Sequence, residues 1–199
     1  MNKFIKKLYS CQKSNQSLVC VGLDPDISRI NQLGVELLDW LRNIVDAVAD
    51  KVCAFKPQIA HFSALSAEKE LEEIIKYIHD NYPNVPVILD AKRGDIGSTA
   101  ERYALEAFER YQADAVTVNP YLGQDSLQPF LDYADKGVIA LCKTSNGGSN
   151  EFQNLKLENG QFLFQQVAVN AANQWNSNNN VLLVVGATYP QELAEIRQI

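Results

Sequence analysis

The chain has 199 residues, of which 46% are hydrophobic and 21% are charged, with a formal net charge of -6. This length suits a domain with a buried core, and the composition excludes collagen-like, low-complexity and disordered chains. The acidic balance argues against nucleic acid or an anionic membrane surface as the main partner, and the apolar runs are too short to span a membrane.

Six short apolar runs have the composition of strands that are buried on both faces. They cover residues 18–23, 52–55, 85–89, 115–118, 138–141 and 181–185. A short N-terminal helix is expected, and amphipathic patterns between the strands predict helices near 37–48, 66–78, 98–108, 127–133 and 162–175, with a last one starting near Pro190. Ser66 is the expected N-cap of the 66–78 helix, and Ser98 with Glu101 forms a predicted capping box.

This alternation of strands and helices predicts an α/β fold with a parallel sheet and helical crossovers. The sheet has two possible closures, an open doubly wound sheet or a (β/α)8 TIM barrel, and residues 1–199 are expected to form a single domain. The Asn-rich residues 176–180 are expected to form a turn. Residues 145–161 make up a longer polar segment, which is either an active-site loop or a surface insertion.

The cysteines and histidines limit the chemistry that is available. The chain has four cysteines, none in a C-x-x-C pair: Cys11, Cys20, Cys53 and Cys142. A disulfide framework is therefore not expected, and a reduced, cytoplasmic protein is the natural interpretation. The only two histidines, His61 and His79, cannot build a three-histidine zinc site, and both are expected to be helix residues.

Polar side chains follow every predicted strand. They occur in residues 22–26, 56–57, 90–95, 119–121, 143–146 and 186–188. Parallel α/β proteins place their active sites at the carboxyl ends of the strands, so these segments predict a functional site at that edge.

Asp90 and Lys92 are two residues apart in a segment expected to be extended, so their side chains should point the same way. Asp24 and Lys56, from neighbouring strand ends, could extend them into an alternating array of carboxylates and ammonium groups. Carboxylates favour the charged form of a lysine, which suits Lys92 to proton donation rather than to Schiff-base chemistry. The alternative is an ion-pair network that only closes the mouth of a barrel.

The turn after Lys92 carries two further candidates. Asp95 lies where the chain enters the next helix. Its two possible roles are a carboxylate of the site and the N-cap of that helix. Thr99 is one turn further on, either in the site or as an ordinary first-turn residue. Gly94 and Gly97 suit a tight turn whose amides approach a ligand.

The segment from Asp90 to Asp95, DAKRGD, fits the D-x-K-x-x-D motif of the orotidine 5'-phosphate decarboxylase family. Further segments resemble the same family, in the same order and across essentially the whole chain: VGLDPD, FKPQIAHF, VILDAKRGDIGSTAERYA, AVTVNPYLG, ALCKTSNGG and VVGAT. The resemblance is to the branch with the DAKRGDI and KTSN forms.

The resemblance implies a (β/α)8 barrel, a homodimer with shared active sites, and neither a cofactor nor a metal ion. The implied reaction converts orotidine 5'-monophosphate to uridine 5'-monophosphate and CO2, the final step of de novo UMP biosynthesis. Lys92 would be the general acid that protonates C6 of the pyrimidine. Asp90 would lie against the substrate carboxylate and orient Lys92.

The resemblance also implies roles for the other site residues. Asp95 and Thr99 would reach into the neighbouring subunit's site, and Asp24 and Lys56 would bind the ribose hydroxyls. Three residues at later strand ends complete the site. Ser145 would contact the pyrimidine ring, and Thr144 is the less favoured choice for that contact. Asn119 lies at a strand end in the site.

A complete barrel of this kind typically has about 250 residues, and only six of the eight strand–helix units are recognisable here. The family's glycine-rich loop with its glutamine and its arginine, which grip the substrate phosphate, would belong to the last two units. We therefore expect these residues to be part of a longer protein that carries the activity.

The alternatives are a magnesium-dependent sugar-phosphate decarboxylase or aldolase of the same superfamily, and an inactive fragment or ligand-binding paralogue. The GLDPD and KTSN segments favour the nucleotide enzyme.

Overall fold

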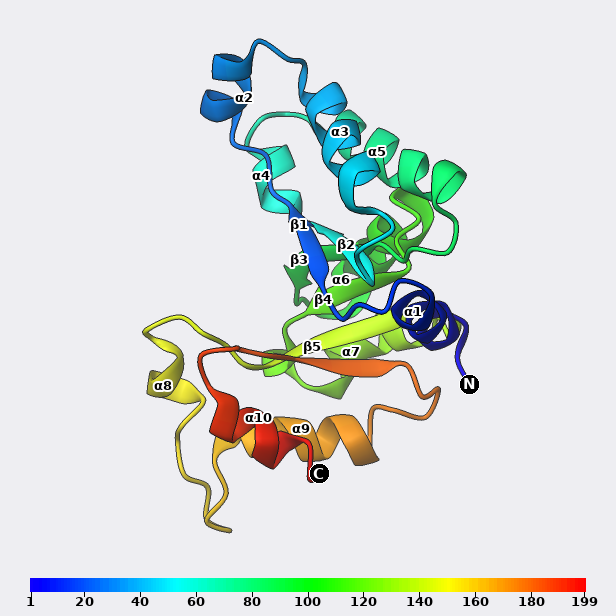
Figure 1. The fold of residues 1–199 in the computed structure, drawn as a ribbon. Helices are drawn as coiled ribbons and strands as arrows, with labels where there is room; N and C mark the ends of the chain where they lie inside the picture. The colour runs from blue at the N-terminus through cyan, green and yellow to red at the C-terminus, as the bar shows by residue number, and fades with distance from the viewer.

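The computed structural model describes residues 1–199, in which parallel strands form a curved sheet with helices outside it (Figure 1). The strands are β1 (Cys20–Leu23), β2 (Ala54–Pro57), β3 (Ile88–Arg93), β4 (Ala115–Val118), β5 (Gly137–Lys143) and β6 (Val181–Val185). Two sheets, β1–β2 and β3–β4–β5–β6, are joined by parallel bridges from Phe55 to Val87 and from Gln58 to Asp90. The strands therefore follow one another in chain order. A doubly wound sheet reverses its strand order at a switch point, so this sequential order favours the barrel.

The helices are α1 (Lys3–Ser14), α2 (Ile27–Leu33), α3 (Leu37–Val48), α4 (Ile59–Ser63), α5 (Glu68–Asn81), α6 (Gly97–Leu105), α7 (Gln124–Leu131), α8 (Ser149–Phe152), α9 (Leu163–Asn173) and α10 (Pro190–Ile196). A π-helical turn, Glu106–Arg110, extends α6, and a 3-10 turn, Pro120–Leu122, precedes α7. None of these helices combines the length and the apolar character needed to cross a membrane.

The strands carry apolar side chains on both faces. The larger core lies between the strands and the helices, and the smaller one lies on the opposite, inner face of the strands. Ala54, Ile88, Ala115 and Ile139 form the inner layer, and Phe4 of α1 packs against them. A Cβ at Gly137 would lie only 2.3 Å from the Phe4 ring, so a glycine is required where α1 covers the amino ends of the strands.

Most predicted elements are confirmed, and the errors lie in strand bounds and at helix starts. The strands predicted at 52–55 and 85–89 lie further along the chain, as β2 and β3. β4 and β6 have the predicted bounds, α10 begins at Pro190, and residues 176–180 connect α9 to β6 without regular structure. Ser66 is not an N-cap, because α5 starts after Ala67 and Ser66 has a left-handed φ of 53°. The capping box is also wrong, since α6 starts at Gly97 and Ser98 lies inside it.

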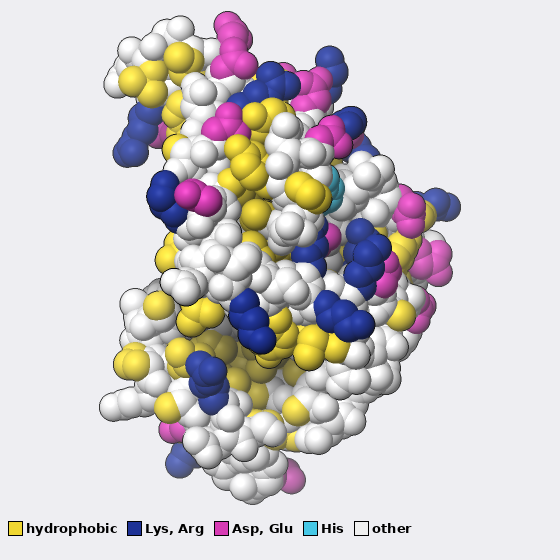
Figure 2. Space-filling model, turned by 45° about the vertical axis from the view of Figure 1, so that its right-hand side comes forward, with side chains coloured by type: hydrophobic (Ala, Val, Ile, Leu, Met, Phe, Trp, Pro, Cys, Tyr) yellow, Lys and Arg dark blue, Asp and Glu magenta, His cyan; other side chains and the backbone are white.

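Three short helices, α2, α4 and α8, were not predicted. They span at most seven residues, too few to repeat an apolar pattern. The 145–161 segment is shaped by α8 and by a bridge between Lys156 and Phe162. On the face in Figure 2, hydrophobic side chains line a hollow in the lower half of the molecule, and Lys and Arg side chains lie near its rim.

A charged cluster ties α1 and α5 to the amino ends of β3 and β4. Asp114 accepts hydrogen bonds from Lys7 Nζ at 2.9 Å and from the Val87 N–H at 2.8 Å, and His79 Nε2 lies 3.2 Å away. Burial raises the pKa of Asp114, but the contacts with His79, Lys7 and Val87 outweigh burial and lower it to about 2. Since this pKa is lowered on folding, the contribution to stability is complete above the unfolded-state pKa and is lost as pH falls toward 2.

We therefore expect Asp114→Asn to lower the free energy of unfolding at pH 7 by about 2 kcal/mol. The difference from the native protein should shrink between pH 5 and pH 3, which urea titrations at several pH values would measure. Asp80→Asn, which changes an exposed pair with Lys76, is the control and should cost less than about 0.5 kcal/mol. A deficit for Asp114→Asn that stays constant with pH would contradict this account.

Candidate active site

Three polar residues form the next inward-facing layer of the strands. Side chains two positions apart on a strand share a face. The residues two positions after Ala54, Ile88 and Ala115 therefore continue the inner layer toward the carboxyl ends. Those positions hold Lys56, Asp90 and Thr117. The apolar interior thus gives way to a charged layer at the edge where parallel barrels hold their active sites.

Asp90 is the centre of this layer and is 6% exposed. Its Oδ1 accepts hydrogen bonds from Lys92 Nζ and Thr117 Oγ1, both at 2.8 Å, and its Oδ2 accepts one from Lys56 Nζ at 2.9 Å. Burial alone would raise the pKa of Asp90, but the hydrogen bonds from Lys92, Lys56 and Thr117 hold it below its ordinary value. Asp90 is therefore a carboxylate between two ammonium groups.

The contact between Asp90 and Lys92 was predicted, but an extended backbone is not what produces it. The segment is not regularly extended, because β3 bulges between Leu89 and Arg93 and Lys92 has a left-handed φ of 48°. A residue other than glycine is rarely found there, and such backbone conformations cluster at functional sites. The side chain of Lys92 remains 46% exposed while its Nζ contacts Asp90.

A cavity of about 960 Å³ adjoins Lys92. Three of the predicted substrate-binding residues line it together with Lys92: Asn119, Thr144 and Ser145. The side chain of Thr144 is occupied by hydrogen bonds with Asn146 and Gln153. That of Ser145 makes no hydrogen bond within the chain, so Ser145 is the better placed of the two to contact a ligand.

Three predicted residues do not join the network within one chain. Asp24 lies at the end of β1, exposed and without an ion pair, so the expected four-residue array is reduced to Lys56, Asp90 and Lys92. Asp95 accepts a hydrogen bond only from the adjacent Ile96 N–H, and Ile96, not Asp95, is the N-cap position of α6. Thr99 is exposed on the first turn of that helix.

Arg93, which lies within the same motif, has a structural role. It faces outward, donates two hydrogen bonds to Glu106 at 2.7 and 3.1 Å, and stacks 4.3 Å from the ring centre of Tyr103. Arg93 thus anchors β3 to the helix that follows it. Its neighbour Gly94 is also constrained, because a Cβ there would lie 3.1 Å from the Asn119 carbonyl oxygen.

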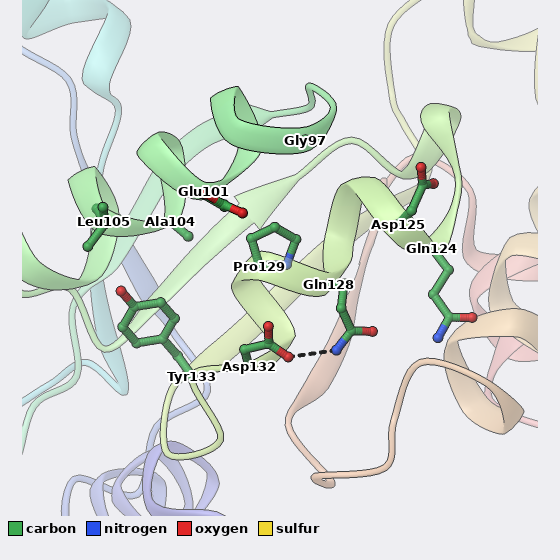
Figure 3. A pocket seen from close by; sticks show the side chains of 10 residues that line it. All are labelled: Gly97, Glu101, Ala104, Leu105, Gln124, Asp125, Gln128, Pro129, Asp132 and Tyr133. Carbon is green, nitrogen blue, oxygen red and sulfur yellow. Dashed lines mark hydrogen bonds between the residues drawn. The ribbon is translucent and has the colours of Figure 1, made fainter.

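A second hollow, of about 840 Å³, lies between α6 and α7 (Figure 3). Its polar lining includes three carboxylates and no lysine or arginine: Glu101, Asp125 and Asp132. Such a lining repels the anionic nucleotide that the sequence resemblance implies, so the cavity beside Lys92 is the better candidate for the substrate.

Lys143, at the end of β5, is a feature that the sequence analysis did not single out. It is fully buried, with no carboxylate partner, and its ammonium group donates to Ser149, Asn150 and Asn154 at 3.2, 2.8 and 3.0 Å. It also lies 4.6 Å from the ring centre of Tyr189. Lys143 thus fastens the 145–161 segment beside the cavity.

We expect Lys143→Met, which keeps the length but removes these donors, to lower the free energy of unfolding by about 1–3 kcal/mol. Amide hydrogen exchange around residues 149–154 should accelerate in the variant. Lys156→Met, on an exposed position of the same segment, should change stability by less than about 0.5 kcal/mol. Equal stability of the two variants would show that the buried contacts contribute nothing.

Sequential parallel strands with a charged layer and a cavity at their carboxyl ends define an enzyme of the (β/α)8-barrel class. A model of the "Orotidine 5'-phosphate decarboxylase / HUMPS family" matches residues 17–199. The chain belongs to this family.

Similar proteins agree with this assignment. Orotidine 5'-phosphate decarboxylases of Ralstonia pickettii and Cupriavidus necator are each 56% identical to the chain, over 99% and 98% of it and over 74% and 73% of their own lengths. The structure of Leishmania donovani OMP decarboxylase superposes with a TM-score of 0.88 at 40% identity, covering 100% of this chain and 76% of that one. The six strand–helix units are therefore consecutive units of a (β/α)8 barrel.

Proposed function

We propose that Lys92 is the general acid of an orotidine 5'-monophosphate decarboxylase, a cofactor-independent carboxy-lyase of UMP biosynthesis. The family and the named relatives support the reaction. The observation that carries the assignment of Lys92 is its hydrogen bond to the buried carboxylate of Asp90, with its side chain still partly exposed beside the cavity.

In this reaction the bond between C6 and the carboxylate carbon breaks, and its electron pair stays on C6. CO2 leaves, and C6 takes a proton from the Lys92 ammonium group to give uridine 5'-monophosphate. The pyrimidine ring offers no position to delocalise the electron pair, so a preorganised positive charge is the main source of stabilisation. The Asp90 contact directs Lys92 Nζ before the substrate arrives.

We assign Asp90 to the position against the substrate carboxylate, where its negative charge favours departure of CO2. Lys56, on the other oxygen of Asp90, and Asp24, at the adjacent strand end, are proposed to bind the ribose hydroxyls. The three cavity residues are proposed to take the pyrimidine end, with Ser145 as the direct contact and the others beside it: Thr144 and Asn119.

We further propose a homodimer with shared sites, acting in the cytoplasm, in which each chain contributes one barrel domain. Asp95 and Thr99 lie outside the network of their own chain, which suits residues that complete the site of a second subunit. Large apolar side chains are exposed next to Asp95 and in the turn that follows the neighbouring strand β4: Ile96 by 60%, Tyr121 by 74% and Leu122 by 46%. Burying these side chains against a second copy would stabilise the pair.

Assays with orotidine 5'-monophosphate and excess EDTA test the proposal against the magnesium-dependent sugar-phosphate alternative. The proposal predicts full turnover with EDTA and none of a β-keto acid sugar phosphate. The hydrogen-bond partners of Asp90 favour this result, since an ammonium group already contacts each of its oxygens and repels a divalent cation. Turnover of the sugar phosphate that depends on Mg²⁺ would overturn the proposal.

A further inference from the structure

The hydroxyl of Thr117 lies where the ladder between β3 and β4 is interrupted. Ile88 pairs with Ala115 and Leu89 with Val116, but the next pair joins Arg93 to Val118. Residues 90–92 of β3 therefore lie opposite the single residue Thr117. The bulge takes their backbone groups out of the regular ladder, so the partly buried N–H groups of Ala91 and Lys92 need another acceptor.

Thr117 Oγ1 supplies that acceptor. It receives hydrogen bonds from the backbone N–H groups of Ala91 and Lys92, both at 3.0 Å. A hydroxyl has two acceptor lone pairs and one proton, so with both lone pairs used its proton is directed at Asp90 Oδ1, 2.8 Å away. One side chain thus satisfies two backbone donors and binds the carboxylate that directs Lys92.

We propose that Thr117 is a positioning residue for decarboxylation, which holds Lys92 in its left-handed backbone conformation and keeps Asp90 as a hydrogen-bond acceptor. Thr117 is 3% exposed and does not line the cavity, so it acts through Asp90 and Lys92 without touching the substrate. This role rests on the proposed function of those two residues.

Thr117→Val preserves the shape of the side chain and removes the hydroxyl. Two partly buried backbone N–H groups lose their acceptor, Asp90 loses one donor, and the conformation of Lys92 is free to relax. Since a displacement of about 1 Å can cost about 10²-fold in rate, we expect kcat to fall by about that factor while KM stays within a few-fold of the native value. Thr117→Ser keeps the hydroxyl and should recover most of kcat.

The second readout is the titration of the Asp90 carboxyl group, followed by carbon NMR in the protein without substrate. The groups that donate hydrogen bonds to Asp90 are Lys56, Lys92 and Thr117, and the Cys20 thiol of β1 also lies near enough to feel its charge. Losing the Thr117 donor should raise the pKa of Asp90 in Thr117→Val and leave it unchanged in Thr117→Ser. A general loss of packing would not separate the two variants in this way.

The activity measurements and the NMR titration separate the proposed function from the proposed role of Thr117. An inactive native protein would overturn the proposed function, and the NMR titration would still decide whether Thr117 sets the state of Asp90. A Thr117→Val protein with native kcat and native Asp90 titration overturns the role of Thr117. So does a Thr117→Ser protein that is as impaired as Thr117→Val. If Thr117→Val does not fold, Thr117→Cys takes its place, and failure of both to fold makes Thr117 a stability residue and overturns the proposal.

Discussion

Lys92→Ala is expected to lower kcat for orotidine 5'-monophosphate by at least about 10⁴-fold, because it removes both the proton donor and the positive charge that faces C6. General acids contribute about 10²–10⁴-fold, and a single preorganised electrostatic contact contributes about 10²–10³-fold. The measurement is loss of substrate absorbance under single-turnover and steady-state conditions.

The fold should tolerate this change. The Lys92 side chain is 46% exposed, and Asp90 retains its hydrogen bonds from Lys56 and Thr117, so we expect a loss of stability below about 1 kcal/mol. Lys69→Ala, on an exposed lysine of α5, is the matched control and should keep native activity. Retention of kcat within tenfold in a folded Lys92→Ala protein would remove Lys92 from the chemistry.

Asp95→Asn is expected to reduce kcat/KM by about 10²–10³-fold, the range for losing one charged contact in a closed site. Mixing this protein with Lys92→Ala provides the sharper test. In a mixed dimer one site combines both defects, and the other combines an intact Lys92 from one subunit with an intact Asp95 from the other. Random exchange should therefore restore about a quarter of the native activity per subunit, since half of the dimers carry one good site.

The control for this mixture is each variant mixed with itself under the same exchange conditions, which should restore nothing. Activity in the Lys92→Ala and Asp95→Asn mixture that equals the sum of the separate variants would contradict shared sites. Asp95 would then act, if at all, on Lys92 of its own chain.

The fold was predictable because strands that are buried on both faces appear in the sequence as runs of apolar residues. β4 shows this most clearly, since all four of its residues are buried and its bounds match the run 115–118. The bounds of β6 match the run 181–185 as well, although its residues are only partly buried. β3 was placed too early, because its carboxyl half, from Asp90 to Arg93, is polar. A run of apolar residues cannot mark the carboxyl end of a strand when the residues there are polar because they form the site.

The candidate site was predicted in part. Alternation along β2 and β3 brings Lys56 and Asp90 to one face, and both lie in the network. Thr117 was missed, although a polar residue inside the four-residue strand β4 is a signal that the inner face needs a hydrogen bond there. Lys143 was missed because its acceptors lie in the 145–161 segment, whose conformation no periodic pattern determines.

The central claim, that this barrel breaks the C6–carboxylate bond and Lys92 protonates C6, is tested most directly by product analysis. The protein is incubated with orotidine 5'-monophosphate in D2O containing EDTA, and UMP and CO2 are quantified by NMR and mass spectrometry. We predict one CO2 for each UMP, with a single deuterium at C6, and no UMP from the Lys92→Ala protein. Absence of UMP from the folded native protein, or equal UMP formation by Lys92→Ala, would contradict it.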